Sequence, residues 1–286
     1  MEAEAIDPKA LEAYKKAFKL DVLRQEWDRE EKKILANPYT ICDLLSNPNP
    51  KKFIDLIKGE VPDASAKWIT KLQKMQYAFR DWFEAQGGAK SDMVNAFTEM
   101  VACPNRAPWA AWSGKAYRGV GRSPSVVSKY DFTGEVKKID GSVWLVAKGS
   151  YKSHYGAQSW SDEWGTAQDF AVDNTNRVGC PIAVVFEVNL KRSDTLLSPD
   201  VVKKISGYGI SEREVIRVGN APIPVTIYVS ATTIEEAISQ KLEKSDGLGN
   251  KARKKVYDRA VALFGVKCAD AFAKTKEFKD LVKDLT

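Results

Sequence analysis

Apolar side chains recur every three or four positions through much of the first hundred residues, which is the spacing of one apolar stripe on a helix. The clearest stripe lies within residues 63–86. Its members are Trp68, Leu72, Met75, Phe79 and Phe83. Such a stripe is typical of a helix packed against a core, and it predicts a helical N-terminal segment over residues 1–104.

After residue 104 the pattern changes to short runs of β-branched and aromatic residues between turn signals, which is typical of strands. One helix, over residues 165–172, is expected to interrupt the strands, and the helical pattern returns after Thr233. The sequence therefore predicts an α+β fold with a mainly β core at 105–232 and a helical C-terminal segment at 233–286. The strand candidates are residues 116–120, 143–151, 182–190, 212–218 and 225–230.

The composition is that of a globular protein, because 44% of the 286 residues are hydrophobic, 10% are aromatic and 29% are charged. No run of about 18 apolar residues is present that could span a membrane. The N-terminus also lacks the basic-then-apolar order of a secretory signal. We therefore expect a monomeric, soluble protein in the cytoplasm of the producing or host cell, with no signal peptide and no membrane contact.

The four cysteines, Cys42, Cys103, Cys180 and Cys268, are scattered without a CxxC pair, and His154 is the only histidine. A zinc site needs several such ligands at characteristic spacings, so we expect no metal site. We interpret the cysteines as reduced and mostly buried, in keeping with a reducing compartment, and we expect no catalytic thiol–imidazole pair. Cysteine proteases and most metallohydrolases are thereby disfavoured.

The net charge of +6 is modest for a chain of this length and permits an acidic partner without demonstrating one. The densest basic run consists of Lys251, Arg253, Lys254 and Lys255. We interpret it as a solvated helix face, because no aromatic side chains are interleaved with it to stack on bases. Contact with nucleic acid stays open as the alternative for this run.

Three short segments of the β core carry candidate chemistry. In the first, residues 116–120, an arginine stands in a short apolar strand and is followed by glycine. Arg118 can offer a planar fork to a phosphate, and Gly119 leaves backbone that a ligand can approach closely. Taken alone, the segment is more typical of a surface arginine near a turn.

The second segment, residues 158–171, places Ser159 and Ser161 two positions apart at the end of a strand. In extended backbone the two serines point the same way, and Trp160 points oppositely, into packing. The simpler interpretation is that one serine caps the helix that follows. That interpretation leaves Trp160 and the paired spacing unexplained.

The third segment, residues 205–216, is a glycine-rich loop that displays Tyr208 and leads into a strand. The strand opens with Glu212 and Glu214, which share one face by the strand period. Like charges held this close disfavour joint ionisation, which costs stability. A charged edge strand that discourages aggregation is the alternative interpretation.

In this order, the three segments resemble the arginine, serine-x-serine and ExE signature of the arginine-specific mono-ADP-ribosyltransferases. About 40 residues separate the arginine from the first serine, and about 50 more lead to the glutamates. The resemblance covers residues 117–229 and is closest to the bacterial-toxin and bacteriophage members, because of the Tyr-Arg-Gly and Ser-Trp-Ser forms. It implies a split β-sandwich that binds NAD⁺ as substrate in a cleft. It also implies transfer of ADP-ribose to an arginine of a target protein, with release of nicotinamide.

The resemblance implies a role for each residue on the NAD⁺ side of the site. Arg118 matches the arginine that binds the phosphate and ribose side of the dinucleotide, and Gly119 lies beside it. Ser159 matches the serine that orients the catalytic glutamate. Ser161 matches the third motif position, which supports the sheet at the NAD⁺ site.

Glu214 matches the catalytic glutamate itself, and Glu212 matches the partner that selects arginine. Tyr208 falls in the loop that contacts the target protein. One departure from the family pattern concerns the middle position of the serine motif. This chain has Trp160 there, and threonine or phenylalanine is also common there in the family. No residue is assigned to stack on nicotinamide, and the helical segments match nothing in the family.

Two other functions stay open. An NAD⁺ glycohydrolase would pass ADP-ribose to water, so free ADP-ribose would appear without labelled protein. A non-catalytic nucleic-acid or partner-binding protein would use the basic C-terminal helices, and NAD⁺ would not raise its melting temperature. Independently of these alternatives, the helical segment before Cys103 is expected to serve target recognition or to act as a scaffold.

Overall fold

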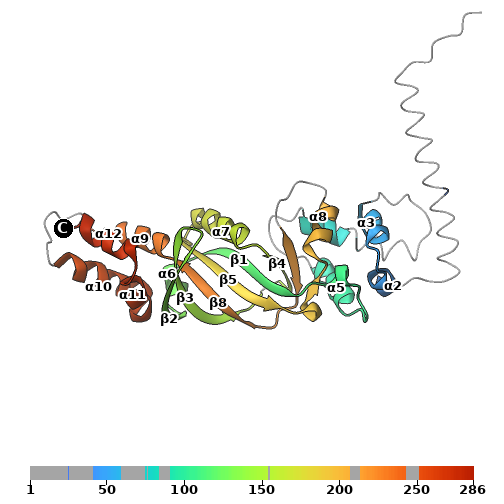
Figure 1. The fold of residues 1–286 in the computed structure, drawn as a ribbon, viewed down its shortest axis with the longest axis horizontal. Helices are drawn as coiled ribbons and strands as arrows, with labels where there is room; N and C mark the ends of the chain where they lie inside the picture. The colour runs from blue at the N-terminus through green and yellow to red at the C-terminus, as the bar shows by residue number, and fades with distance from the viewer. Residues whose placement is uncertain are drawn as a thin grey trace, which may run out of the picture.

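The structure is a computed structural model that describes residues 25, 41–58, 75, 77–83, 91–153, 155–206, 213–242 and 251–286. The molecule is elongated, with a twisted sheet in the middle, N-terminal helices at one end and C-terminal helices at the other (Figure 1). The predicted α+β class is confirmed by this mixture of helices and antiparallel strands.

The strands of the described residues form one eight-stranded antiparallel sheet in the order β2-β3-β8-β5-β1-β4-β7-β6. The predicted strands at 143–151 and 182–190 are confirmed within one residue, and those at 116–120 and 225–230 extend further than predicted. The eight strands are β1 (Gly114–Arg122), β2 (Asp131–Ile139), β3 (Ser142–Tyr151), β4 (Ala157–Ser161), β5 (Ile182–Leu190), β6 (Thr195–Leu196), β7 (Glu214–Val218) and β8 (Ile223–Ser230).

The sheet nearly divides between β1 and β4. β1 pairs with β5 along its whole length, whereas a single pair, Tyr117 opposite Ser161, joins β1 to β4. β4 in turn pairs along its whole length with β7. The sheet therefore consists of a five-stranded part, β2-β3-β8-β5-β1, and a three-stranded part, β4-β7-β6, that meet at a narrow junction.

Helices cover the sheet and extend it at both ends. α7 (Trp164–Asp173) confirms the helix predicted at 165–172, and it lies across β1 and β5 (Figure 1). A further helical stretch is found at residues 77–83. The other helices of the described residues are α2 (Ile41–Ser46), α3 (Lys51–Lys58), α5 (Ser91–Val101), α6 (Pro124–Val127), α7 (Trp164–Asp173), α8 (Pro199–Ser206), α9 (Ala231–Ser239), α10 (Ala252–Phe264), α11 (Val266–Phe272) and α12 (Lys276–Asp284).

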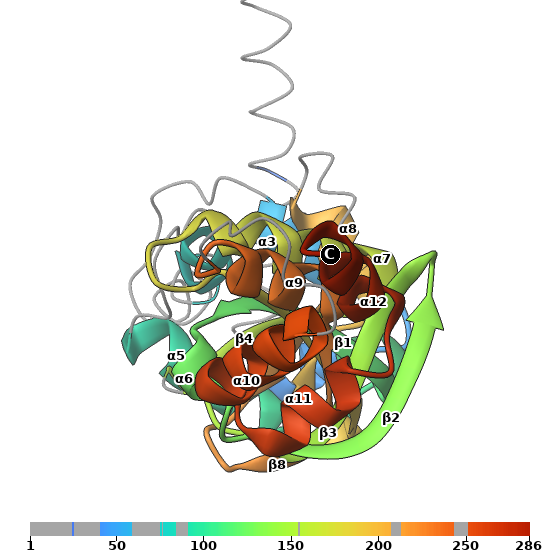
Figure 2. The same ribbon diagram turned by 90° about the vertical axis from the view of Figure 1, so that its left-hand side faces the viewer.

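The C-terminal helices gather at the end of the sheet where β2 and β3 lie (Figure 2). Ser230, the last residue of β8, caps α9 with its side chain. Val256 and Phe272 of these helices share one buried cluster with Leu145 and Val229 of the sheet. The C-terminal segment therefore belongs to the same core as the five-stranded part.

The N-terminal helices share a second core with the three-stranded part of the sheet. Phe53 and Phe97 are buried in one cluster with Ile216 and Val218 of β7. Burial of a large apolar side chain stabilises a fold by roughly 1.5–3 kcal/mol. The division into segments at residue 104 stays a prediction, but the helices before it and the strands after it stabilise each other.

The predicted apolar stripe is confirmed where the structure describes it. Met75 and Phe79 are buried, and Phe83 is half-buried against the same cluster. Trp68 and Leu72 lie outside the described residues. The stripe therefore faces the core that the N-terminal helices share with β7.

Cys42 and Cys103 form a disulfide, so the prediction that the cysteines are reduced is wrong for this pair. α2 packs beside the end of α5 and brings the two α-carbons within 5.1 Å, although 61 positions separate them. Cys180 and Cys268 are free thiols, and burial raises the pKa of the Cys268 thiol to about 12. Cysteine usage therefore no longer argues for a reducing compartment.

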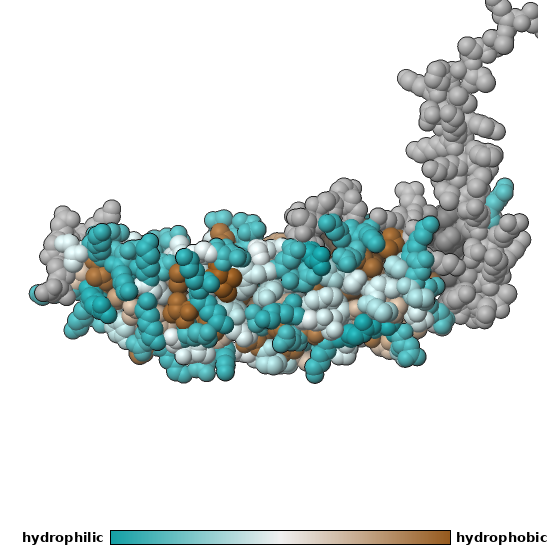
Figure 3. Space-filling model, viewed as in Figure 1, coloured by the Kyte–Doolittle hydropathy of each residue, from teal (hydrophilic) through white to brown (hydrophobic). Residues whose placement is uncertain are grey.

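The face of the molecule shown in Figure 3 is mainly hydrophilic, and its apolar residues gather in a few separate patches. Exposed apolar side chains such as Phe170 and Val178 are scattered, which is ordinary for a protein surface. None of the helices in the described part of the chain is long and apolar enough to cross a membrane.

A chain shortened to begin at Asn105 tests whether the N-terminal segment is a separate domain. Its removal would uncover Ile216 and Val218 and would delete the disulfide. Because each uncovered side chain forfeits roughly 1.5–3 kcal/mol, we expect the shortened chain to be insoluble or to unfold without a cooperative transition. Solubility and thermal melting by circular dichroism measure this. A soluble fragment with a sharp transition would instead support a domain boundary at residue 104.

Candidate active site

The three residues predicted to carry the chemistry lie on three neighbouring strands. β1 carries Arg118, β4 carries Ser159, and β7 begins with Glu214. Because neighbouring strands are about 4.8 Å apart, antiparallel pairing brings together residues from distant parts of the sequence. Of the other predicted site residues, Gly119 lies on β1 and Ser161 on β4, whereas Tyr208 and Glu212 lie outside the described residues.

The register of β4 and β7 determines which side chains share a face. Ser161 lies opposite Glu214, and Ser159 lies opposite Ile216. Directly opposed residues project from the same face of a sheet, so both serines share a face with Glu214, and Ser159 is its diagonal neighbour. Trp160 points to the opposite face, where it is 2% exposed and packs 5.4 Å from the Tyr151 ring. The predicted packing of Trp160 is thereby confirmed.

Arg118 spans the narrow junction between β1 and β4. Its neighbour Tyr117 is the residue that faces Ser161, so Arg118 projects from the Trp160 side, with its guanidinium carbon 6.0 Å from the Tyr151 ring centre. One guanidinium nitrogen donates to the main-chain carbonyl of Ser159. The Nε atom is buried without a hydrogen-bond partner, and a buried donor without an acceptor costs about 1–3 kcal/mol.

Ser161 forms a local turn between β4 and α7. Its hydroxyl accepts a hydrogen bond of 3.1 Å from the main-chain N–H of Glu163, and Glu163 is the N-cap residue of α7. This contact is close to the capping role that was the simpler interpretation of the motif. It accounts for Ser161 but not for Ser159, and contact of either serine with NAD⁺ stays a prediction.

Gly119 has a packing role that the sequence did not reveal. A Cβ at this position would overlap the carbonyl oxygen of Ala167 and come within 2.5 Å of the main-chain nitrogen of Ala171, both in α7. The close approach for which a glycine is needed is therefore made by the backbone of α7. Gly119 therefore allows α7 to pack closely on β1, and contact of Gly119 with NAD⁺ stays a prediction.

Glu214 is only 8% exposed, and a residue from the N-terminal helices reaches it. Trp82 donates a hydrogen bond from Nε1 to Oε1 of Glu214, over a distance of 2.7 Å. The Trp82 ring packs 5.6 Å from Phe97 of α5. Sequence analysis missed Trp82, although it lies three positions after Phe79 and therefore beside the apolar stripe.

Arg213, the residue just before β7, binds the end of β4. Its guanidinium donates two bonds of 2.9 and 2.8 Å to the two carboxylate oxygens of Asp162, and the Asp162 N–H donates to the Arg213 carbonyl at 3.2 Å. Hydrogen bonding to Asp162, and its charge, raise the pKa of Arg213 above the ordinary value. A two-point contact of this kind restricts the orientation of both side chains. It therefore holds the chain in place directly before Glu214, the first residue of β7.

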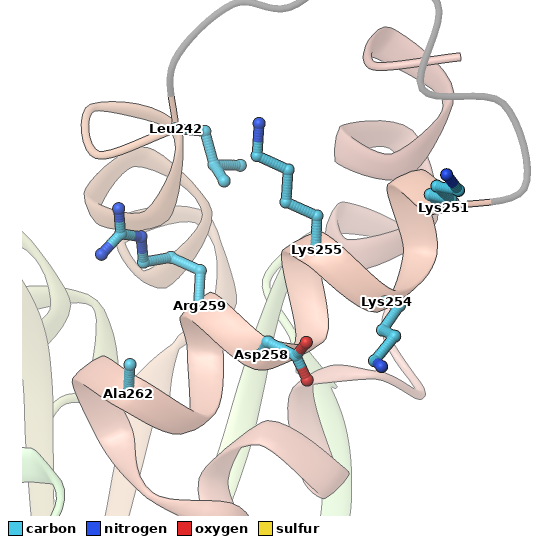
Figure 4. A pocket seen from close by; sticks show the side chains of 7 residues that line it. All are labelled: Leu242, Lys251, Lys254, Lys255, Asp258, Arg259 and Ala262. Atoms are coloured by element: carbon cyan, nitrogen blue, oxygen red, sulfur yellow. The ribbon is translucent and has the colours of Figure 1, made fainter.

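A cavity of about 690 Å³ lies at the other end of the molecule, beside α10. Its lining includes three lysines of the predicted basic run, but Lys254 and Asp258 point to one side of the helix while Lys255 and Arg259 point to the other (Figure 4). Arg259 donates to the carbonyl of Lys241 at 2.7 Å. Side chains that diverge in this way do not form one anion-binding site. The lining residues are Leu242, Lys251, Lys254, Lys255, Asp258, Arg259 and Ala262.

No protein-family model, curated protein or solved structure matches this chain. Within the described residues, no group of histidine, cysteine, aspartate or glutamate side chains is arranged to hold a metal ion. Inference about function therefore depends on the residues where β1, β4 and β7 meet.

The packing role of Gly119 can be tested with a matched pair of glycines. Gly119→Ala should destabilise the fold by about 3 kcal/mol, because the backbone of α7 cannot yield as a flexible side chain can. Gly165→Ala is the control, because a Cβ at this position in α7 would meet nothing within 4 Å. Urea unfolding measures both, and equal stabilities would contradict the packing role.

Proposed function

We propose that this protein is an NAD⁺-dependent mono-ADP-ribosyltransferase that modifies an arginine of a target protein. One observation carries the proposal: the three predicted motifs meet on adjacent strands, where Arg118 donates to the main-chain carbonyl of Ser159 from one face of the sheet and the side chains of Ser159 and Glu214 share the other face. The turn contact of Ser161 accounts neither for the bond from Arg118 to Ser159 nor for the burial of Glu214. The narrow junction between β1 and β4 also supports a split β-sandwich as the finer description of the sheet.

The reaction needs one carboxylate to stabilise the positive charge that develops on the sugar. Nicotinamide leaves NAD⁺ as a neutral molecule from a cationic ring, so its departure needs no general acid, unlike ordinary glycoside cleavage. The sugar that remains develops positive charge. The carboxylate of Glu214 is suited to stabilise that charge, and a preorganised contact of this kind is typically worth about 3–4 kcal/mol.

The acceptor needs a second carboxylate. A free guanidinium is protonated at neutral pH and is a poor nucleophile. In the proposed reaction an acceptor nitrogen bonds to C1′ of the ribose, the bond from C1′ to nicotinamide breaks, and Glu212 accepts the proton that the guanidinium loses. Tyr208, in the glycine-rich segment that the sequence predicts to be a loop, is assigned to contact with the target protein.

Arg118 is assigned to the phosphates of NAD⁺. A guanidinium offers a planar fork of donors that matches phosphate oxygens, whereas lysine offers a point charge. One of the Arg118 nitrogens already donates to Ser159. The side chain is thus fixed on the Trp160 face of the junction, opposite to the face of Glu214. A dinucleotide that contacts both residues would therefore pass between β1 and β4, where the two strands separate.

Arg118→Ala should raise the Michaelis constant for NAD⁺, and Arg118→Lys should restore little, because the planar fork is absent from both variants. Arg122→Ala is the control, because Arg122 lies on the same strand and its guanidinium carbon is 5.6 Å from the Phe186 ring centre. Steady-state kinetics measure the constants, and melting temperatures report the loss of the bond to Ser159. An unchanged Michaelis constant in Arg118→Ala would refute the assignment.

The proposal as a whole is tested by incubating the protein with labelled NAD⁺, a bacterial lysate and a small guanidine acceptor, followed by mass spectrometry. Label on an arginine is the expected result. Free ADP-ribose without any labelled acceptor would identify an NAD⁺ glycohydrolase instead. Absence of any NAD⁺ turnover would overturn the proposal.

In the same assay, variants of the two glutamates should lose different activities. Glu214→Ala should lose both arginine transfer and nicotinamide release by about 10²- to 10³-fold, because sugar-cation stabilisation precedes the choice of acceptor. Glu212→Gln should abolish transfer to arginine but still release nicotinamide to water. Equal loss of both activities in Glu212→Gln would remove the arginine-selecting role, and full activity in Glu214→Ala would contradict the transferase proposal itself.

A further inference from the structure

The contact between Trp82 and Glu214 joins two distant parts of the chain. The donor and acceptor residues are 132 positions apart, and their atoms lie 2.7 Å from each other. Trp82 belongs to the helical stretch at 77–83, outside the region that carries the three motifs. Nothing in the motifs themselves requires a tryptophan at this place.

We propose that Trp82 is a positioning residue for Glu214. Its indole N–H fixes the orientation of the carboxylate that stabilises the sugar cation. This inference rests on the proposed transferase function and deepens it. It makes the N-terminal helical segment part of the active site.

Burial explains why Glu214 needs such a donor. A carboxylate that is 8% exposed has lost most of its hydration, and donors within the protein must compensate for that loss. An indole N–H is a donor only, so its bond is strongest to the ionised carboxylate. A carboxylate group is planar, so fixing one of its oxygens restricts the direction of the other.

Trp82 is itself held in place by buried aromatic rings. Phe97 packs against the indole at 5.6 Å with the ring planes at 66°. Phe97 also lies 5.0 Å from Phe79, and both phenylalanines are fully buried. Trp82 itself is half-buried, so the fully buried Phe97 restricts the indole on the side that faces the core. The donor is therefore preorganised, as electrostatic stabilisation of a transition state requires.

Trp82→Phe tests the inference, because it keeps an aromatic ring against Phe97 and removes only the ring N–H and some volume. The matched control is Trp109→Phe. Trp109 lies in the same buried cluster, is 8% exposed, and donates from Nε1 to the Asn47 carbonyl at 2.6 Å. Both variants therefore lose one indole hydrogen bond in one core, but only Trp82 contacts Glu214.

We expect kcat for nicotinamide release to fall about 10- to 100-fold in Trp82→Phe, the range expected for a hydrogen bond to a charged group. The Michaelis constant for NAD⁺ should stay within about twofold, because the bond acts on the transition state. Trp109→Phe should keep its kcat while losing similar thermal stability. Equal kcat values in Trp82→Phe and wild type, or a higher value in the variant, would overturn the inference.

The contact has a second readout that needs no activity. In a ¹H–¹⁵N NMR spectrum of the ¹⁵N-labelled protein, the indole N–H signal of Trp82 is identified as the one that is missing from the spectrum of Trp82→Phe. The chemical shift of this signal should change in Glu214→Gln, whereas that of the Trp109 signal should not. A Trp82 signal that does not move would show that the contact is absent and would overturn the inference. If the signal moves but the wild type turns over no NAD⁺, the contact stands and the transferase function fails, and the positioning role fails with it.

Discussion

One residue pair, Tyr117 and Ser161, joins the two parts of the sheet, so the geometry of the candidate site depends on what else spans that junction. Where β1 and β4 separate, a main-chain carbonyl that would otherwise pair across the strands needs another donor. The Arg118 side chain supplies one to Ser159. The side chain assigned to NAD⁺ therefore also replaces a bond of the sheet. A loss of function in Arg118 variants has meaning only beside a measurement of stability.

β7 lies between two cores, and this position determines the surroundings of Glu214. Ile216 and Val218 face the cluster of the N-terminal helices, whereas Val215 belongs to the cluster that the C-terminal helices share with the five-stranded part. A strand packed on both faces has a strongly specified register, because a slip of one residue would exchange its two faces. The helices at both ends of the molecule thus contribute to the placement of one carboxylate.

The strands with strong local patterns could be predicted, and the contacts between distant segments could not. β5, a run of β-branched and apolar residues, was predicted at its observed bounds, because it is buried on both faces. β2 was missed, because it is a polar edge strand with Gly134 at a φ of 77° and a shift in register. The alternation in β4 predicted the faces of Ser159 and Trp160. No local pattern indicates the Cys42–Cys103 disulfide or the bond from Trp82 to Glu214, because both depend on how helices pack.

The sequence places Arg213 directly before Glu214, and a cation is an ordinary partner for a carboxylate. The structure directs the Arg213 guanidinium to Asp162 instead, since successive residues of a strand point to opposite faces. A tryptophan from the N-terminal helices donates to Glu214 in its place. For the proposed chemistry, Arg213 bound to this carboxylate would place a positive charge beside the sugar on which positive charge develops. The indole N–H carries no charge, so this contact orients the carboxylate without neutralising it.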